Sequence, residues 1–186
     1  MKPTLIAEDY ARAAVALNVP DSRVIAVTKV EARSKGFDDN DQPIILFERH
    51  KFWAFTSGKY ADDHPDICNK MPGGYSSNNT SEWIRLQKAM ALDETAAMKS
   101  ASYGLFQIMG FNYAVCGFDY VQDFFHAMQE SEADHLDAFV RFVKAASNRP
   151  MLLALQRGDA QAFAKLYNGP NYVVNKYDTK LKAEGF

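Results

Sequence analysis

Only one stretch of this chain carries a convincing β signal, and it interrupts a sequence that is otherwise patterned for short helices. The segment DDND at 38–41 has the composition of a turn, and the segment PIILFERHKFW at 43–53 is apolar and extended. Pro43 is tolerated there because a proline can occupy the first position of a strand. We therefore predict a small β-hairpin within an α+β fold that is predominantly α-helical.

The helix that precedes this hairpin is the one that most concerns function. It starts near Asp21 or Ser22, either of which suits an N-cap. Its inward face is defined by three valines that recur at helical spacing, Val24, Val27 and Val30. This spacing places Glu31 at the C-terminal end of the helix, on or beside the inward face. Gly36 suits the left-handed residue that closes a helix.

The rest of the chain predicts one long loop followed by a series of helices. Glycines and prolines at 57–81 indicate an ordered loop, and loops of that length in a compact domain are often functional. Further on, Ser131 with Asp134 three residues later resembles a capping box. Gly158 followed by Asp159 predicts the end of one helix and the start of the next.

Length and composition limit the classes of protein that the chain can belong to. At 186 residues, with 47% hydrophobic and 24% charged residues, we expect a single globular domain spanning 1–186. The net charge of −2 argues against binding to nucleic acid through phosphate contacts, which needs a basic face. No apolar run approaches the roughly 20 residues that span a bilayer, and the N-terminus lacks the apolar core of a signal peptide. We therefore expect synthesis in the cytoplasm and no stable membrane insertion.

The motifs give no support to metal or cofactor chemistry. The four histidines form no H-E-x-x-H pattern, and neither Cys68 nor Cys116 lies near a histidine pair at ligand spacing. Glu132 and His135 form one Glu-x-x-His motif, whereas a di-iron helix bundle needs two. The sequence has no phosphate-binding glycine loop and no G-x-S-x-G nucleophile elbow. We therefore expect no metal and no cofactor.

Carboxylates remain as the candidate catalytic groups. A glutamate at the apolar end of a helix can have its pKa raised by desolvation, so that it stays protonated near neutral pH and can act as an acid. Cleavage of a glycosidic bond needs such an acid, together with a group that stabilises oxocarbenium-like charge or activates water. Glu31 meets this requirement, because valines precede it and a turn that could open a cleft follows it. By spacing alone, a solvated surface glutamate is still the commoner outcome.

Several motifs favour a catalytic Glu31 over a solvated surface glutamate. SYGLFQIMG at 102–110 resembles the G-L-M-Q-I signature of the lysozyme-like superfamily of soluble lytic transglycosylases and goose-type lysozymes, and LYNGPNY at 166–172 resembles its Y-N-G-G segment. A longer series also resembles the N-acetylmuramidase domain of bacteriophage endolysins. In chain order, its members are KVEARSKGF, PIILFERHKFW, HPDICN, PGGY, SASYGLFQIMGFNYAVCGF and FAKLYNGPNY. The resemblance therefore covers nearly the whole chain.

This resemblance implies a lysozyme-like fold, with the small hairpin beside a cleft, and it implies site residues. Glu31 matches the glutamate of the family's V-E-S-x-G segment, the general acid, and Glu48 matches the glutamate of L-F-E-R-H, a second catalytic carboxylate. The segment 32–35 departs from the small residues usual in the family and adds charge beside the acid. The residues expected to bind sugar are Gln107, Tyr167, Asn168 and Tyr103, the last of which stands where the family commonly has a tryptophan.

Each of these matches also has a structural alternative. Glu48 could pair with Arg49 or Arg85 and simply hold the hairpin together. Gln107 could instead satisfy backbone groups in a tight turn. Tyr167 could fill the core, and Asn168 could cap a helix.

The implied function is that of a peptidoglycan-degrading endolysin, a lysozyme-type muramidase. It would hydrolyse the β-1,4 bond between N-acetylmuramic acid and N-acetylglucosamine by general acid catalysis and cause bacterial lysis. One alternative is a lytic transglycosylase, in which the 6-hydroxyl of muramic acid attacks and a 1,6-anhydro sugar results. The other is an inactive cell-wall-binding module. We expect a monomer without a separate wall-binding domain. It would reach the glycan strand once the membrane is permeabilised, by a holin if the protein is phage-encoded.

Overall fold

Helices form most of the chain in the computed structural model, which describes residues 1–31 and 35–186 without the side chains of Glu31, Pro170 and Asn171. The α-helices are α1 (Ala7–Leu17), α2 (Asp21–Glu31), α3 (Arg49–Phe55), α4 (Asn79–Met90), α5 (Glu94–Lys99), α6 (Val121–Ala127), α7 (Glu132–Lys144), α8 (Arg149–Arg157), α9 (Ala160–Asn168) and α10 (Tyr177–Ala183). Three short 3₁₀ turns are η1 (Gly110–Asn112), η2 (Ala146–Asn148) and η3 (Pro170–Val173). The prediction of a predominantly helical α+β fold is confirmed.

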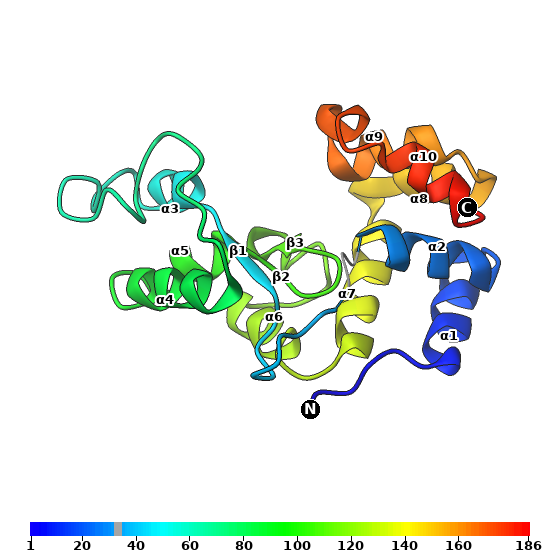
Figure 1. Ribbon diagram of the computed structural model, residues 1–186, viewed down its shortest axis with the longest axis horizontal. Helices are drawn as coiled ribbons and strands as arrows, with labels where there is room; N and C mark the ends of the chain where they lie inside the picture. The colour runs from blue at the N-terminus through cyan, green and yellow to red at the C-terminus, as the bar shows by residue number, and fades with distance from the viewer. Residues whose placement is uncertain (32–34) are drawn as a thin grey trace.

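Helix α7 runs through the middle of the molecule and separates two groups of elements (Figure 1). On one side, α1 and α2 lie beside α8, α9 and α10, and α10 contacts both α2 and α9. On the other side, the small sheet lies with α3, α4, α5 and α6. The two ends of the chain thus build one half of the molecule, and its central part builds the other.

The sheet has three antiparallel strands in the order β1 (Ile45–Phe47), β2 (Ala101–Tyr103) and β3 (Ile108–Met109). The register pairs Leu46 with Ser102 and Ser102 with Met109. These three residues therefore form one row across the sheet. Because successive side chains of a strand point to opposite faces, the row lies on one face and Tyr103 points to the other.

The predicted hairpin at 38–53 is only partly right. A tight turn is present, and Phe37 and Pro43 pair across it in an isolated β-bridge. Strand β1, however, pairs with β2, which lies far along the chain. The hairpin of the sheet is formed by β2 and β3. The chain also stops being extended after Glu48 and enters α3. The aromatic residues of this segment suggested a strand, but helical geometry buries Phe52 against Phe47, with ring centroids 6.0 Å apart. Strand propensity depends on context, and tertiary packing overrides it here.

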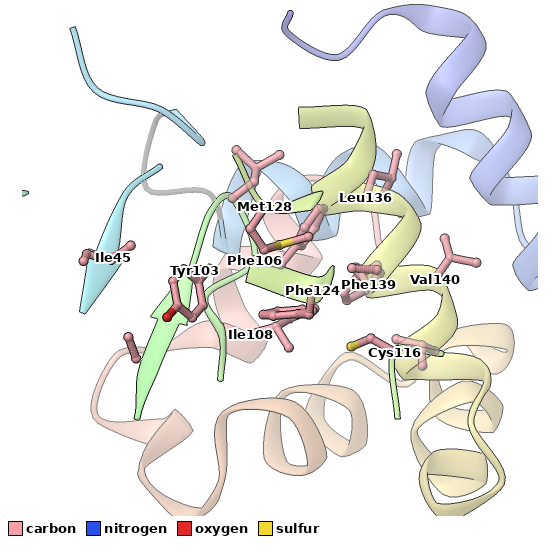
Figure 2. Close-up of a cluster of buried hydrophobic side chains, with 14 of the residues drawn as sticks. Ile45, Tyr103, Phe106, Ile108, Cys116, Phe124, Met128, Leu136, Phe139 and Val140 are labelled. Carbon is pink, nitrogen blue, oxygen red and sulfur yellow. The ribbon is translucent and has the colours of Figure 1, made fainter. Parts of the chain in front are cut away.

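One hydrophobic core links α7 to the sheet (Figure 2). Phe139 of α7 stacks on Phe106 with ring centroids 4.5 Å apart, and both side chains are buried. Beneath the sheet, Tyr103 lies between Phe124 and Phe125 of α6. Aromatic pairs of this kind stabilise a core by about 0.5–1.5 kcal/mol beyond the effect of their buried area. The core therefore fixes the position of the β2–β3 turn relative to α7.

The predicted helix ends are mostly confirmed, with one correction. The Ser131 hydroxyl accepts a hydrogen bond from the Asp134 N–H at 3.1 Å, and Gly158 adopts a left-handed conformation with φ of 71°. Gly36, by contrast, does not have the left-handed backbone that we predicted. Glycine is needed at this position because the backbone lies close to the His135 ring, and a Cβ there would lie 2.7 Å from Nδ1 of His135.

None of the helices in the described ranges 1–31 and 35–186 is long and apolar enough to cross a membrane.

Candidate active site

A cleft of about 550 Å³ lies between the sheet and the helices of the C-terminal part of the chain. The row of Leu46, Ser102 and Met109 lines it from the sheet side. The facing residues come from α7, α9 and α10 and are Phe142, Tyr167, Asn168 and Tyr177. The cleft therefore brings together segments that are far apart in the sequence.

Gln107 lies in the β2–β3 turn and lines the cleft. Its amide Nε2 donates hydrogen bonds to the carbonyls of Ile44 at 3.0 Å and Gly104 at 2.8 Å, and its Oε1 accepts one from Ser102 Oγ at 2.9 Å. Its own backbone is left-handed, with φ of 49°. The structural alternative, in which Gln107 satisfies backbone groups in a tight turn, is thus correct. Its position in the cleft is compatible with sugar contact as well, which stays a prediction.

Tyr167 and Asn168 end helix α9 and line the cleft opposite the sheet. The Tyr167 hydroxyl donates a hydrogen bond to the Phe106 carbonyl at 2.8 Å, and its half-buried ring stacks on Phe163 with centroids 5.7 Å apart. This bond ties α9 to the β2–β3 turn across the cleft. Two residues predicted to bind sugar therefore lie where the resemblance implies, and Tyr167 also has a structural role.

Tyr103 does not fit its predicted role as a sugar-stacking ring. Its side chain is 1% exposed, and its hydroxyl donates a hydrogen bond to the Met98 carbonyl at 3.0 Å. Burial raises the pKa of this phenol well above its ordinary value of 10.0. The physical reason is strand alternation, since the neighbouring Ser102 faces the cleft and Tyr103 must face the core. The same alternation, applied to the sequence, would have identified Ser102 as the cleft residue.

Glu31 is the last residue of α2, and its side chain lies outside the described part of the chain. The next described residue, Lys35, lines the cleft. Lys35 therefore lies at the same cleft as Gln107 and Tyr167. Of the departure from the family pattern at 32–35, residues 32–34 lie outside the described part of the chain.

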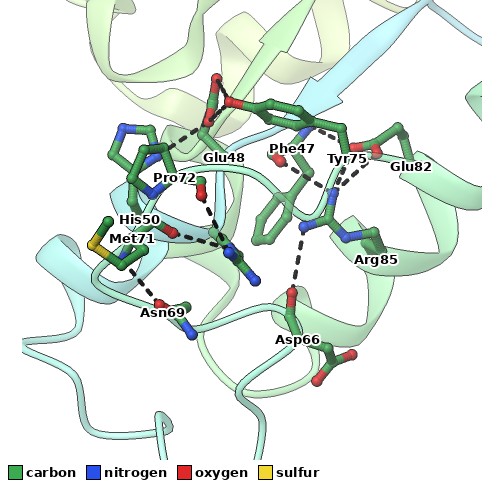
Figure 3. Close-up of polar contacts among 11 residues, drawn as sticks. Phe47, Glu48, His50, Asp66, Asn69, Met71, Pro72, Tyr75, Glu82 and Arg85 are labelled. Atoms are coloured by element: carbon green, nitrogen blue, oxygen red, sulfur yellow. Dashed lines mark hydrogen bonds and ion pairs between the residues drawn. The ribbon is translucent and has the colours of Figure 1, made fainter. Parts of the chain in front are cut away.

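Glu48 directly follows β1 and is the N-cap residue of α3, and it is not among the described residues that line the cleft. Its side chain is 16% exposed. Both carboxylate oxygens accept from the Tyr75 hydroxyl, at 3.0 and 3.2 Å, and His50 Nδ1 lies 3.1 Å from Oε2 (Figure 3). These partners differ from the arginines that we had considered as structural alternatives.

The two arginines have other partners. Arg49 donates hydrogen bonds to the carbonyls of Met71 and Pro72 (Figure 3). Arg85 donates to both carboxylate oxygens of Glu82 at 3.0 Å, and that carboxylate also accepts from the Phe47 N–H at 2.8 Å. The buried Glu82–Arg85 pair thus holds the end of β1, next to Glu48. The spacing of three residues on one helix is a sequence signal for this ion pair, but nothing in the sequence indicates its contact with β1.

The Glu-x-x-His motif at the start of α7 has a structural role. Glu132 accepts hydrogen bonds from the backbone N–H groups of Gly36 at 2.8 Å and Leu5 at 3.2 Å. His135 Nδ1 accepts one from the Leu105 N–H at 3.1 Å, and its Nε2 donates to the Met128 carbonyl at 2.7 Å. Within 1–31 and 35–186, no three His, Cys, Asp or Glu side chains come together as a metal site requires.

Comparisons with known proteins identify what this chain resembles. Residues 21–184 match the Muramidase family profile, described as N-acetylmuramidase. The crystal structure of the Burkholderia AP3 phage endolysin superposes with a TM-score of 0.91 at 39% sequence identity, covering 97% of this chain and 69% of that chain. A comparison with curated proteins gives no match.

Proposed function

Because the chain belongs to the N-acetylmuramidase family, we propose that it is a peptidoglycan-degrading endolysin that cleaves the β-1,4 bond following N-acetylmuramic acid. The observation that carries this proposal is the cleft. Three predicted sugar-binding residues, Gln107, Tyr167 and Asn168, come from opposite sides of the molecule and line it together. A glycan strand binding along this cleft would pass between the sheet and α9.

Glu31 is proposed as the general acid. It ends helix α2, whose preceding turns bury Val24 and Val27 completely in the core. The C-terminal end of a helix carries partial negative charge, which favours the protonated form of a carboxyl group. A protonated carboxyl group at the cleft can give its proton to the departing glycosidic oxygen.

Glu48 is proposed as the supporting carboxylate. The Tyr75 hydroxyl donates a hydrogen bond to its carboxylate. A carboxylate next to the sugar ring can stabilise positive charge on that ring or position a water molecule.

Mass spectrometry of digested peptidoglycan tests the reaction. We expect muropeptides that end in reducing N-acetylmuramic acid. Ends of 1,6-anhydromuramic acid would show a lytic transglycosylase, and reducing glucosamine ends would show cleavage at the other bond. Absence of any released muropeptide would leave the wall-binding module as the better interpretation.

The proposal extends to how the protein works in the cell. It acts as a monomer and reaches the cell wall after the membrane is permeabilised, by a holin if it is phage-encoded. Light scattering coupled to size-exclusion chromatography checks the oligomeric state. A stable dimer would contradict this part and leave the reaction untouched.

A further inference from the structure

The segment Met71–Tyr75, which contains the PGGY motif, lies against Glu48, and the proposal above uses only its Tyr75 hydroxyl. The Tyr75 side chain is 49% exposed, and its hydroxyl reaches both oxygens of the Glu48 carboxylate at 3.0 and 3.2 Å (Figure 3). A hydrogen bond from a neutral hydroxyl to a carboxylate is charge-assisted and roughly twice as strong as one between neutral groups. The contact therefore restricts the orientation of Glu48.

Arg49 holds this segment, which we call the strap, from the adjacent α3. Its guanidinium donates to the Met71 carbonyl at 3.0 Å and to the Pro72 carbonyl at 3.1 Å. Gly73 and Gly74 are both left-handed, with φ of 101° and 71°, and a Cβ on Gly74 would lie 3.0 Å from Nη1 of Arg49. Two consecutive glycines thus let the strap follow the guanidinium closely.

The residues on either side of the strap are held as well. Before it, the Asn69 carboxamide accepts from the Met71 N–H at 2.9 Å, and the Asn69 N–H donates to the Arg49 carbonyl at 3.3 Å. After it, the Ser76 N–H donates to the buried Glu82 carboxylate. Tyr75 is therefore a half-exposed residue on a segment that is fixed at both ends. A chance contact between Tyr75 and Glu48 on the surface would not need a segment held at both ends.

We infer that Tyr75 is a positioning residue for Glu48 and that the strap exists to deliver its hydroxyl to that carboxylate. The inference rests on the proposed role of Glu48. A carboxylate that stabilises charge or positions water must present its oxygens in a fixed direction, and misplacement by about an ångström can reduce the rate of an enzyme by about 10²-fold. Tyr75 supplies one donor to both oxygens from outside the sheet, while His50 lies against Oε2.

The test is a double-mutant cycle of Tyr75→Phe with Glu48→Gln, measured as muropeptide release from purified peptidoglycan. Phenylalanine keeps the ring and removes the hydroxyl, so we expect kcat to fall about tenfold with KM unchanged, the scale of one lost charge-assisted hydrogen bond. In the Glu48→Gln background, Tyr75→Phe should have little further effect, because the carboxylate that the hydroxyl orients has already been replaced by an uncharged amide. A purely structural role would reduce activity equally in both backgrounds.

Two further variants test whether the strap acts on kcat through Glu48. Arg49→Gln removes the hydrogen bonds that hold the strap and should lower kcat in the wild-type background but not in Glu48→Gln. Tyr120→Phe is the matched control, since Tyr120 is 68% exposed at the start of α6, and it should leave kcat unchanged. Circular dichroism and thermal melting confirm that each variant is folded.

The outcomes separate this inference from the proposed function. Slow release by Glu48→Gln with normal release by Tyr75→Phe would overturn the inference alone. Normal release by Glu48→Gln would overturn the proposed role of Glu48 and the inference with it. Equal effects of Tyr75→Phe in the two backgrounds would also overturn the inference.

Discussion

At the scale of single residues, the two catalytic candidates differ in the kind of element that they end. Glu31 ends a helix whose inward face is buried, whereas Glu48 ends a strand and accepts a hydrogen bond from a tyrosine hydroxyl. The C-terminal end of a helix carries partial negative charge, which favours the neutral form of a carboxyl group. An acid and an ionised partner are the pair that glycosidic cleavage uses.

Replacing Glu31 with glutamine should therefore abolish most of the activity while leaving the fold intact. General acid catalysis contributes about 10²–10⁴-fold, so we expect lysis to slow by about that factor. Glu48→Gln should cost less if the carboxylate only stabilises charge, and a similar amount if it activates water. The measurement is the rate of turbidity clearing on outer-membrane-stripped cells, with the exposed Glu8→Gln of α1 as the control. Near-normal clearing by Glu31→Gln would show that another group is the acid.

The Tyr103 side chain should affect stability rather than substrate binding. Tyr103→Phe leaves the buried Met98 carbonyl without its donor, which should lower the free energy of unfolding by about 1–2 kcal/mol. Tyr103→Ala should lower it by about 3–5 kcal/mol, the usual cost of deleting a buried aromatic ring. Urea denaturation gives these values. A raised KM for peptidoglycan in Tyr103→Ala that is still folded, with the KM of Tyr103→Phe unchanged, would restore the stacking role.

At the scale of elements, the sequence predicted helices well and pairing poorly. The periodicity of α2 and the caps at Ser131 and Asp159 are local signals, and the structure bears them out. The partner of β1 lies more than fifty residues away, and no local pattern encodes that distance. The hairpin prediction is right about the turn and wrong about the strand partner for this reason.

For the candidate site, too, the sequence predicted some residues and not others. Gln107, Tyr167 and Asn168 were found because they belong to motifs, and they do line the cleft. Tyr75 and Ser102 also lie in quoted motifs, PGGY and SASYGLFQIMG, but they were not singled out because their importance comes from side-chain contacts, with Glu48 and with Gln107. Residue type and spacing do not reveal such contacts.

The β2–β3 turn depends on a glycine for two reasons, and this can be measured. Gly104 is left-handed, with φ of 68°, and a Cβ there would lie 2.5 Å from His135. Gly169 also has a positive φ of 73°, but its ψ of −169° lies outside the left-handed helical region, and it has open space around it. We expect Gly169→Ala to cost about 1–3 kcal/mol of unfolding free energy from backbone strain alone. Gly104→Ala should cost about 1–2 kcal/mol from strain and about 1–3 kcal/mol more because of overpacking. Equal losses in the two variants would show that the ring of His135 yields freely.

At the scale of the whole molecule, α7 joins the two sides of the cleft. Glu132 binds the backbone at Gly36, on the segment that leaves α2, and His135 binds Leu105 in the β2–β3 turn. The relative position of Gly36 and the β2–β3 turn thus depends on two side chains of one helix, one helical turn apart. Of these two, His135 can change its charge within the physiological pH range.

This dependence predicts a loss of stability at acidic pH. Burial lowers the pKa of His135 from its ordinary value of 6.5, opposed in part by its hydrogen bond to Met128 and the charges of Glu132 and Asp134. Below about pH 6.5 the imidazole of His135 binds a proton in the unfolded chain but not in the folded protein. The free energy of unfolding therefore decreases as the pH is lowered, until the pH reaches the lower pKa of the folded protein. Above that range both states are neutral and His135 contributes no slope.

Thermal melting between about pH 5 and 7 tests this prediction by comparing the wild type with His135→Asn. Asparagine can accept from the Leu105 N–H but does not titrate, so the variant should be less stable near neutral pH and yet lose less stability on acidification. His126→Asn, a change at an exposed histidine of α6, should keep the wild-type slope. If His135→Asn melts with the wild-type pH dependence, another group governs the acid sensitivity. If its slope is flattened, the protonation of one buried imidazole decides whether α7 can hold the β2–β3 turn, and with it the cleft, in place.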